Sequence, residues 1–279
     1  MGGAALVGFV AGGVALAAFF AVVFARSGLL ERRVSYFPTH DVDHSPADVG
    51  LAFENVRLET SDGVSLHGWF VPGERDVTIL WMHGNGGNIA YHLGSLPDLH
   101  ARLGVSLFLF DYRGFGLSDG TPGEHGFYRD ATAALDYLRS RSDVRNDRIV
   151  YFGQSLGTAV AIELATRAAP LGIILEAPFP SGPYMAHRLV PSLPMWFHRY
   201  FIPNRYDSLS RLGRIHAPML VVHGDQDATV PHEAGQVVFE AANEPKEMVT
   251  IPGGGHVDSF VVDGDVYFEA LTRFLDRLG

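Results

Sequence analysis

The stretch Gly153-Gln154-Ser155-Leu156-Gly157 decides the fold, because it joins a strand pattern to a helix pattern with no loop between them. Residues 148–152 are rich in β-branched and aromatic side chains, which is typical of a buried parallel strand. Residues 158–165 are alanine-rich with apolar side chains at helical spacing, which predicts a helix. So short a turn forces Ser155 into a strained backbone, where flanking glycines remove side chains that would collide. We predict a nucleophile elbow that exposes the Ser155 hydroxyl above the carboxyl edge of a sheet; the alternative is a serine that only caps a helix.

Strand and helix patterns alternate on both sides of this elbow. Further strands are expected at residues 77–82, 105–110, 172–176, 219–222 and 248–251, and a hairpin over 54–70 turns at Asp62-Gly63. Helices are expected at 89–103, with a kink or break at Pro97, and at 128–141, 232–242 and 266–278. The alternation predicts one α/β domain over residues 31–279, a mostly parallel sheet with helices on both faces.

Residues 180–217 differ from the rest of this predicted domain. They form a long, proline-broken and aromatic stretch between two predicted strands, and a compact domain rarely carries such a stretch without a use. We interpret it as a short helical cap inserted over the active site, with Tyr184, Met185, Trp196 and Phe197 as pocket residues.

A serine hydroxyl is a weak nucleophile near neutral pH, so a histidine must take its proton and an acid must orient that histidine. His256 is the favoured base, because it follows the last predicted strand in a glycine-rich loop that can bring its ring across the sheet edge. His83 and His223 also follow strands, but each directly precedes a glycine at a tight turn, which favours a structural role.

Asp227 is the favoured acid, because it lies further along the loop after residues 219–222 than Asp225 does. We expect Asp225 to shape that turn by accepting local backbone hydrogen bonds. Glu176, at the end of another predicted strand, is the outside candidate.

An oxyanion hole needs two N–H donors aimed at the position where negative charge develops on the carbonyl oxygen. We expect them to be the backbone N–H of Leu156 and that of Asn85, the latter within His83-Gly84-Asn85-Gly86-Gly87-Asn88. A phosphate-binding loop is the rival interpretation of this turn, but the Walker lysine and its Ser/Thr neighbour are missing. Histidines are scattered and H-E-x-x-H is absent, so no metal site and no cofactor are expected.

Several motifs resemble those of one known family. In chain order they are the glycine-rich turn above, Asp111-Tyr112-Arg113-Gly114-Phe115-Gly116-Leu117-Ser118, the elbow, His223-Gly224-Asp225-Gln226-Asp227 with Val230-Pro231, and Gly255-His256. The chain is similar to α/β-hydrolases, and within them to membrane-anchored α/β-hydrolase-domain (ABHD-type) proteins and serine aminopeptidase-like hydrolases. The resemblance implies an α/β-hydrolase fold with Ser155 as nucleophile, Asp227 as acid and His256 as base. It also implies activities such as acylglycerol lipase, lysophospholipase or protein depalmitoylation, without fixing the substrate.

The amino terminus predicts a membrane anchor within residues 1–30. Residues 4–24 are almost wholly apolar, and about 20 such residues in a helix span roughly the 30 Å core of a bilayer. Arg26, Arg32 and Arg33 follow, so the positive-inside rule places the catalytic domain in the cytoplasm. The alternative is a signal peptide cleaved after Val23-Phe24-Ala25, which would make the protein secreted or periplasmic.

Composition narrows the remaining functions. The net charge is −10, Lys246 is the only lysine, and no basic run supports nucleic-acid binding. Cysteine is absent, which excludes disulfides, cysteine nucleophiles and thiolate metal sites. We expect a hydrolase of carboxylic esters or thioesters with a small-molecule or lipid acyl substrate. The alternatives are an aminopeptidase-like serine peptidase and a non-catalytic anchored scaffold.

Overall fold

The computed structural model describes residues 35–279, so the anchor predicted within residues 1–30 lies outside the described part. The strands are β1 (Phe37–Pro38), β2 (Glu54–Glu59), β3 (Ser65–Val71), β4 (Arg75–Met82), β5 (Gly86–Gly87), β6 (Val105–Phe110), β7 (Ile149–Gln154), β8 (Gly172–Glu176), β9 (Met219–Gly224) and β10 (Lys246–Ile251). The helices are η1 (Pro46–Val49), η2 (Ile89–Gly94), α3 (Leu96–Leu103), α4 (Glu124–Ser140), α5 (Leu156–Ala165), α6 (Gly182–Leu189), α7 (Met195–Phe201), α8 (Leu209–Leu212), α9 (His232–Ala241), α10 (Ser259–Val262) and α11 (Gly264–Arg277). Within residues 35–279, no helix combines the length and apolar character needed to cross a bilayer.

Eight strands form one mostly parallel sheet in the order β10-β9-β8-β7-β4-β6-β3-β2. Six neighbouring strands of this sheet, β10, β9, β8, β7, β4 and β6, pair in parallel. At the other end, β3 runs antiparallel to β6 and β2 runs antiparallel to β3. Asp62-Gly63 turns the β2–β3 hairpin as the sequence predicts.

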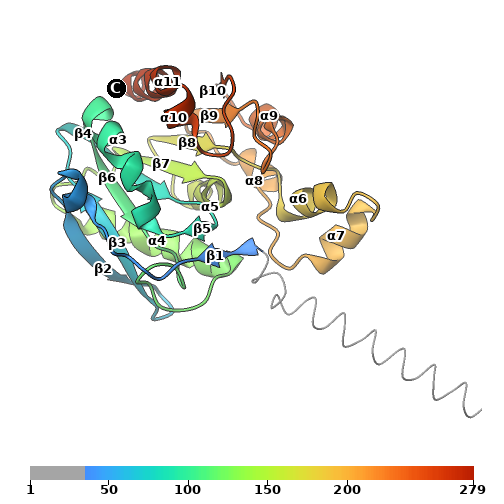
Figure 1. Ribbon diagram of the computed structural model, residues 1–279, viewed down its shortest axis with the longest axis horizontal. Helices are drawn as coiled ribbons and strands as arrows, with labels where there is room; N and C mark the ends of the chain where they lie inside the picture. Colours follow the sequence, from blue (N-terminus) through green and yellow to red (C-terminus); the bar gives the residue numbers. More distant parts are fainter. Residues whose placement is uncertain (1–34) are drawn as a thin grey trace, which may run out of the picture.

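The sheet buries apolar side chains on both faces, and helices cover each face (Figure 1). In the central strand β4, Leu80 and Met82 join the cluster that contains buried residues of α4, α5, α8 and α9. Ile79 and Trp81 join the opposite cluster, which contains buried residues of η2, α3 and α11. This layered α/β architecture confirms the fold class that the sequence predicts.

The topology brings the functional loops to one edge. β4 lies between β6 and β7, so the chain leaves β4 toward one side of the sheet and returns to its other side. In such sheets the carboxyl ends of the strands at this switch point form the binding crevice. The turn after β4, the elbow after β7 and the loops after β9 and β10 all begin at that edge, because these strands are parallel.

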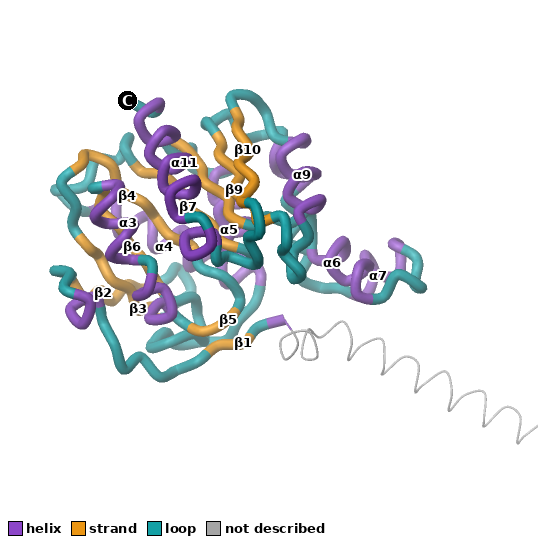
Figure 2. The backbone as a smooth tube through the Cα atoms, turned by 45° about the horizontal axis from the view of Figure 1, so that its top comes forward, coloured by secondary structure: helices purple, strands orange, loops and turns teal. Residues whose placement is uncertain are grey.

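The break predicted near Pro97 is present. Residues 89–103 are divided into η2 and α3 on either side of Ser95, and Pro97 lies in the first turn of α3, where a missing N–H is tolerated. A small sheet pairs Phe37 with Gly86 and Pro38 with Gly87, which no sequence pattern indicated. Between β8 and β9 lie α6, α7 and α8, in the stretch predicted as a cap, and α6 and α7 stand out from the body beside each other (Figure 2).

Candidate active site

Ser155 occupies a strained position between β7 and α5. Its backbone has φ +50° and ψ −115°, a combination that costs about 1–3 kcal/mol for a residue with a side chain. The Ser155 N–H donates to the Glu176 carbonyl of β8 (2.8 Å), and the Thr158 hydroxyl donates to the Ser155 carbonyl (2.6 Å). These bonds fix the turn, so the hydroxyl is held at the carboxyl end of β7, where 8% of Ser155 is exposed.

The two glycines of the elbow are required by close backbone approaches. A Cβ on Gly157 would lie 1.9 Å from the Met82 carbonyl oxygen and 2.6 Å from that of His83. A Cβ on Gly153 would lie 2.5 Å from the Gly157 carbonyl oxygen. The first turn of α5 therefore packs directly against the end of β4, which brings the turn that follows β4 beside Ser155.

Three side chains predicted from the sequence meet at this edge. The Ser155 Oγ lies 3.0 Å from His256 Nε2, and His256 Nδ1 lies 2.8 Å from Asp227 Oδ2. A carboxylate can only accept, so Nδ1 carries the proton and Nε2 is left free to accept one from the serine hydroxyl. Ser155, His256 and Asp227 come from the loops after β7, β10 and β9, respectively.

Asp227 is held as an anion by its surroundings. Its Oδ1 accepts hydrogen bonds from the N–H groups of Thr229 and Val230, both at 2.8 Å. Burial alone would raise the pKa of Asp227, but hydrogen bonds from His223 and His256 outweigh burial and hold that pKa well below its ordinary value of 3.8. The carboxylate is therefore charged at neutral pH and can stabilise an imidazolium at His256.

The turn after β4 lies next to the serine. Gly84 is so close that a Cβ on it would lie 3.7 Å from the Ser155 Cβ. In the described part of the chain, no hydrogen bond is formed by the backbone N–H of Asn85 or by that of Leu156 at the start of α5. The Asn85 side chain instead donates to the Ser35 carbonyl (2.8 Å), and this contact ties the turn to the chain just before β1.

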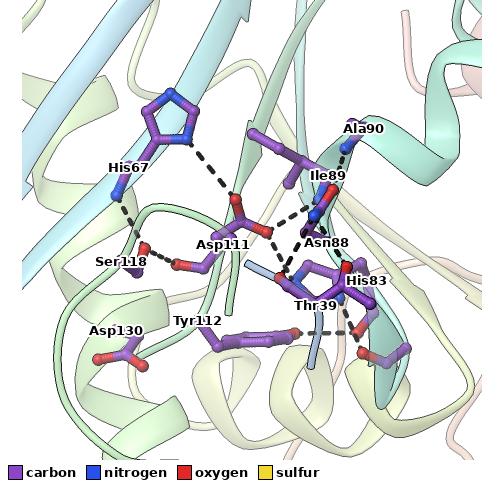
Figure 3. A network of polar contacts seen from close by, with 12 residues as sticks. Thr39, His67, His83, Asn88, Ile89, Ala90, Asp111, Tyr112, Ser118 and Asp130 are labelled. Carbon is purple, nitrogen blue, oxygen red and sulfur yellow. Dashed lines mark hydrogen bonds and ion pairs between the residues drawn. The ribbon is translucent and has the colours of Figure 1, made fainter. Parts of the chain in front are cut away.

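A buried polar network packs beside this turn (Figure 3). The Asp111 Oδ1 accepts from the Ile89 N–H (2.8 Å), and the Asn88 side chain donates to the Thr39 hydroxyl (2.9 Å). His83 Nδ1 lies 2.8 Å from the Gly84 carbonyl oxygen, which can only accept, so this nitrogen carries a proton. The network gives a structural role to Asp111, the first residue of the motif Asp111-Tyr112-Arg113-Gly114-Phe115-Gly116, which the sequence did not reveal.

The two other candidate histidines, His83 and His223, have structural roles, as the sequence suggested. Burial, reinforced by the neighbouring His92, lowers the pKa of His83 from 6.5 to about 3, so this ring stays neutral. His223 is fully buried, and its Nε2 lies 2.8 Å from the Val230 carbonyl oxygen. A Cβ on Gly235 of α9 would lie 2.1 Å from the His223 ring, so that glycine makes room for the imidazole.

The other two candidate carboxylates, Asp225 and Glu176, bond to other groups and not to the His256 ring. Asp225 Oδ1 accepts from the Gly253 N–H (2.7 Å), a partner in the loop after β10, whereas the sequence suggested a local one. Glu176 accepts from Gln154 Nε2 (2.7 Å) and from the Tyr267 hydroxyl (3.2 Å), and burial raises the pKa of its carboxyl group. Asp227 is thus the carboxylate that contacts His256.

Asp258 is a supporting residue that sequence reasoning missed. Its Oδ1 accepts from the Gly255 N–H (2.7 Å), which fixes the loop directly before His256. The spacing of Asp258 two residues after His256 was the only available signal.

The four predicted cap residues divide into two pairs. Tyr184 and Met185 of α6 are half-buried and pack against the core cluster that includes Leu156. Trp196 of α7 is exposed, and Phe197 stacks closely on Phe201, with ring centroids 4.3 Å apart.

The metal-ligating side chains of the described residues do not gather into a metal site near the active site. Within residues 35–279, no three His, Cys, Asp or Glu side chains gather in a way that could hold a metal ion. A surface depression of about 820 Å³ lies between α3 and α11, lined by residues that include Arg102, Phe268 and Arg273, and none of the three active-site side chains lines it.

The eight-stranded sheet, the strained serine between strand and helix, and the Ser–His–Asp contacts define the class of α/β-hydrolases. The sequence profile of the family "Hydrolase_4: Serine aminopeptidase, S33" matches residues 73–211. The chain belongs to the α/β-hydrolase superfamily.

Similar sequences and a similar solved structure are known. The chain is 39% identical to "Uncharacterized protein Rv2307c" of Mycobacterium tuberculosis, over 94% of this chain and 92% of that protein. It is 35% identical to "Alpha/beta hydrolase domain-containing protein WAV2" of Arabidopsis thaliana, over 84% of this chain and 82% of that protein. The fold is similar to that of the Pyrococcus furiosus esterase Pf2001, with a TM-score of 0.73 and 22% identity over 88% of this chain and 99% of the esterase.

Proposed function

We propose that this chain is a serine hydrolase that cleaves carboxylic esters or thioesters of lipid-like acyl substrates through an acyl-Ser155 intermediate. The observation that carries the proposal is the 3.0 Å contact between the Ser155 Oγ and His256 Nε2, with Asp227 bonded to the opposite ring nitrogen. A nucleophile within reach of a base that a third group orients is the arrangement that acyl transfer requires.

In the proposed first step, the Ser155 Oγ attacks the substrate carbonyl carbon while His256 Nε2 takes the hydroxyl proton. The resulting imidazolium is stabilised by the Asp227 carboxylate. The N–H groups of Leu156 and Asn85 donate to the negative oxygen of the tetrahedral intermediate, because neither is engaged in a hydrogen bond within the described residues.

Collapse of the intermediate breaks the bond to the alcohol or thiol. His256 gives its proton to that leaving group, and the acyl group stays on Ser155. His256 then takes a proton from water, the hydroxide attacks the acyl carbon, and a second collapse releases the acid and restores the serine hydroxyl. Every proton in this cycle passes through His256 Nε2, so no cofactor is needed.

A lipid-like substrate is supported by the apolar cap and by the amino-terminal sequence. Tyr184 and Met185 present apolar surface next to the core around α5, and the apolar run of residues 4–24 is suited to a single-pass membrane anchor. We propose that this run anchors the protein with its catalytic domain in the cytoplasm. Carbonate extraction of membranes tests the anchor, because release of the intact protein would contradict it.

Turnover of p-nitrophenyl esters by purified protein tests the proposed chemistry. Ser155→Ala and His256→Ala should each lower kcat by about 10⁴- to 10⁶-fold. Ser210→Ala changes an exposed serine outside the site and should retain full activity. Similar activity in Ser155→Ala and in Ser210→Ala would contradict the proposed nucleophile, and an inactive but folded wild type would favour the non-catalytic scaffold.

Peptide hydrolysis is a second candidate, favoured by the description of the matching family as serine aminopeptidases. An aminopeptidase needs carboxylates near its pocket to hold the free amine of its substrate. Asp207 is the only acidic residue within residues 180–217, which counts against peptides. A higher kcat/KM on aminoacyl p-nitroanilides than on p-nitrophenyl esters would reverse this preference.

A further inference from the structure

The cap hairpin, defined here as residues 180–208, is attached to the domain at its base. The Gly182 N–H donates to the Arg205 carbonyl (2.7 Å), so the two ends of the hairpin are joined to each other. The Glu124 carboxylate of α4 accepts the Arg205 N–H (2.5 Å), which joins the base to the body of the protein. The base of the hairpin therefore has a defined place on the body of the protein.

That outer surface is apolar to a degree unusual for an exposed element. Leu189 is 84% exposed and Trp196 is 68% exposed, whereas Trp69 and Trp81 are buried. His198 Nε2 of α7 lies 3.2 Å from the Val190 carbonyl oxygen, which places the end of α6 beside α7. Large exposed apolar side chains on one small element favour a binding surface.

The same surface is positively charged although the protein as a whole is negative. Arg188, Arg199 and Arg205 are exposed, and Asp207 at the base is the only acidic residue of the cap hairpin. The net charge of the complete chain is −10, so the cap hairpin is a local cationic patch. Arg199 lies three residues after Trp196 on α7 and shares its face.

The chain enters the described fold at the foot of the cap hairpin. The Tyr36 hydroxyl lies 2.6 Å from the Tyr206 hydroxyl, and β1 begins on the side from which α6 and α7 stand out (Figures 1 and 2). Residues 25–35 separate this point from the apolar run of residues 4–24, and these eleven residues extend to at most about 40 Å. With the proposed anchor in a bilayer, the foot of the cap hairpin at Tyr206 stays within about that distance of the bilayer surface.

We propose that the cap hairpin docks on the surface of a bilayer that contains anionic lipid. Trp196 and Leu189 enter the boundary between headgroups and acyl chains, and Arg188 and Arg199 contact lipid phosphates. Tryptophan and leucine flanked by arginine suit this boundary, because the first two bury apolar area while the guanidinium groups remain among the headgroups. Docking does not depend on the chemistry at Ser155.

Trp196 is a built-in reporter, because the other two of the three tryptophans are buried. The full-length protein is reconstituted into phosphatidylcholine vesicles with and without phosphatidylglycerol, made from lipids brominated on their acyl chains or from unbrominated lipids. The difference in emission between wild type and Trp196→Phe isolates the Trp196 signal. Bromine should quench about half of this signal in the anionic vesicles, because an interfacial helix is buried about 5–10 Å deep.

Reversal of charge on the cap hairpin should remove this quenching. The Arg188→Glu/Arg199→Glu pair is compared with Arg139→Glu/Arg214→Glu, which changes the net charge equally at exposed positions outside the cap hairpin. Quenching should be lost in the first pair and kept in the second and in Ser155→Ala. An unquenched Trp196 in the wild type, or equal quenching in both charge-reversed pairs, would overturn the proposal. Shielding of Trp196 from aqueous iodide without quenching by bromine would also overturn it, in favour of a protein segment on this surface.

Discussion

Replacement of Gly157 by alanine tests how the elbow depends on backbone contact. The added Cβ would lie 1.9 Å from the Met82 carbonyl oxygen, while ordinary contacts begin near 3.4 Å, so the backbones must separate by about 1.5 Å. Overpacking of this kind costs about 1–3 kcal/mol, against a gain of up to about 1 kcal/mol from the better helix propensity of alanine. The net effect on stability is therefore a loss.

Gly157→Ala should lower the activity as well as the stability. The displaced atoms belong to the end of β4, and the turn that carries Asn85 follows directly. A shift of about 1 Å between reacting groups can lower a rate by about 10²-fold, so we expect kcat to fall by that order with a smaller change in KM.

Chemical denaturation and p-nitrophenyl ester kinetics measure both effects of Gly157→Ala. Gly86→Ala is the matched control, since a Cβ on Gly86 meets nothing within 4 Å although the residue lies in the neighbouring turn. The control should keep its stability and its kcat. A Gly157→Ala protein that is as stable and as active as Gly86→Ala would refute the close packing of α5 on β4.

Three further predictions concern charge and attachment. Asp227→Asn should lower kcat by about 10⁴-fold while the protein stays folded. The ¹³C carboxyl signal of wild-type Asp227 should show no titration step between pH 3 and 7, because hydrogen bonds from His223 and His256 depress its pKa; a step near its ordinary 3.8 would contradict these hydrogen bonds. The pKa of buried His83 is depressed from 6.5 to about 3, so the unfolded chain takes up this proton at a higher pH than the folded protein does. The contribution of His83 to the free energy of unfolding should therefore fall by about 1.4 kcal/mol per pH unit as the pH drops from 6 to 4; a His83 ring that titrates near 6.5 by NMR would exclude this. Glu124→Ala removes the acceptor of the Arg205 and Tyr206 N–H groups. Hydrogen exchange in residues 195–206 should therefore become faster by the equivalent of about 1.5–3 kcal/mol. Unchanged protection would rule out the attachment of the cap hairpin through Glu124.

The parts of the fold that could be predicted from the sequence are those with a local physical signature. The elbow needs glycines at fixed distances from Ser155, and buried strands such as residues 105–110 and 172–176 are marked by continuous apolar runs, so both were placed from the sequence. The pairing of Phe37 with Gly86 involves strands of two residues, which are too short to show a periodicity.

The supporting contacts of the site could not be predicted for a different reason. Asp111 reaches the Ile89 N–H across 22 positions, and Glu176 reaches Gln154 across another 22, through side chains whose meeting depends on the register of the sheet. His256 could be singled out because a base must follow a late strand in this fold, whereas the position of Asp258 became meaningful only when its contact with Gly255 was seen.

The serine hydroxyl at the end of β7 and the imidazole that reaches it from the loop after β10 are the centre of this account. The most direct measurement is labelling with a fluorophosphonate, followed by mass spectrometry of the peptide that contains residues 148–165. A single adduct on Ser155 in wild type, and its absence in folded Ser155→Ala, is the expected result. Absence of an adduct on folded wild type, or equal labelling of both proteins, would contradict it.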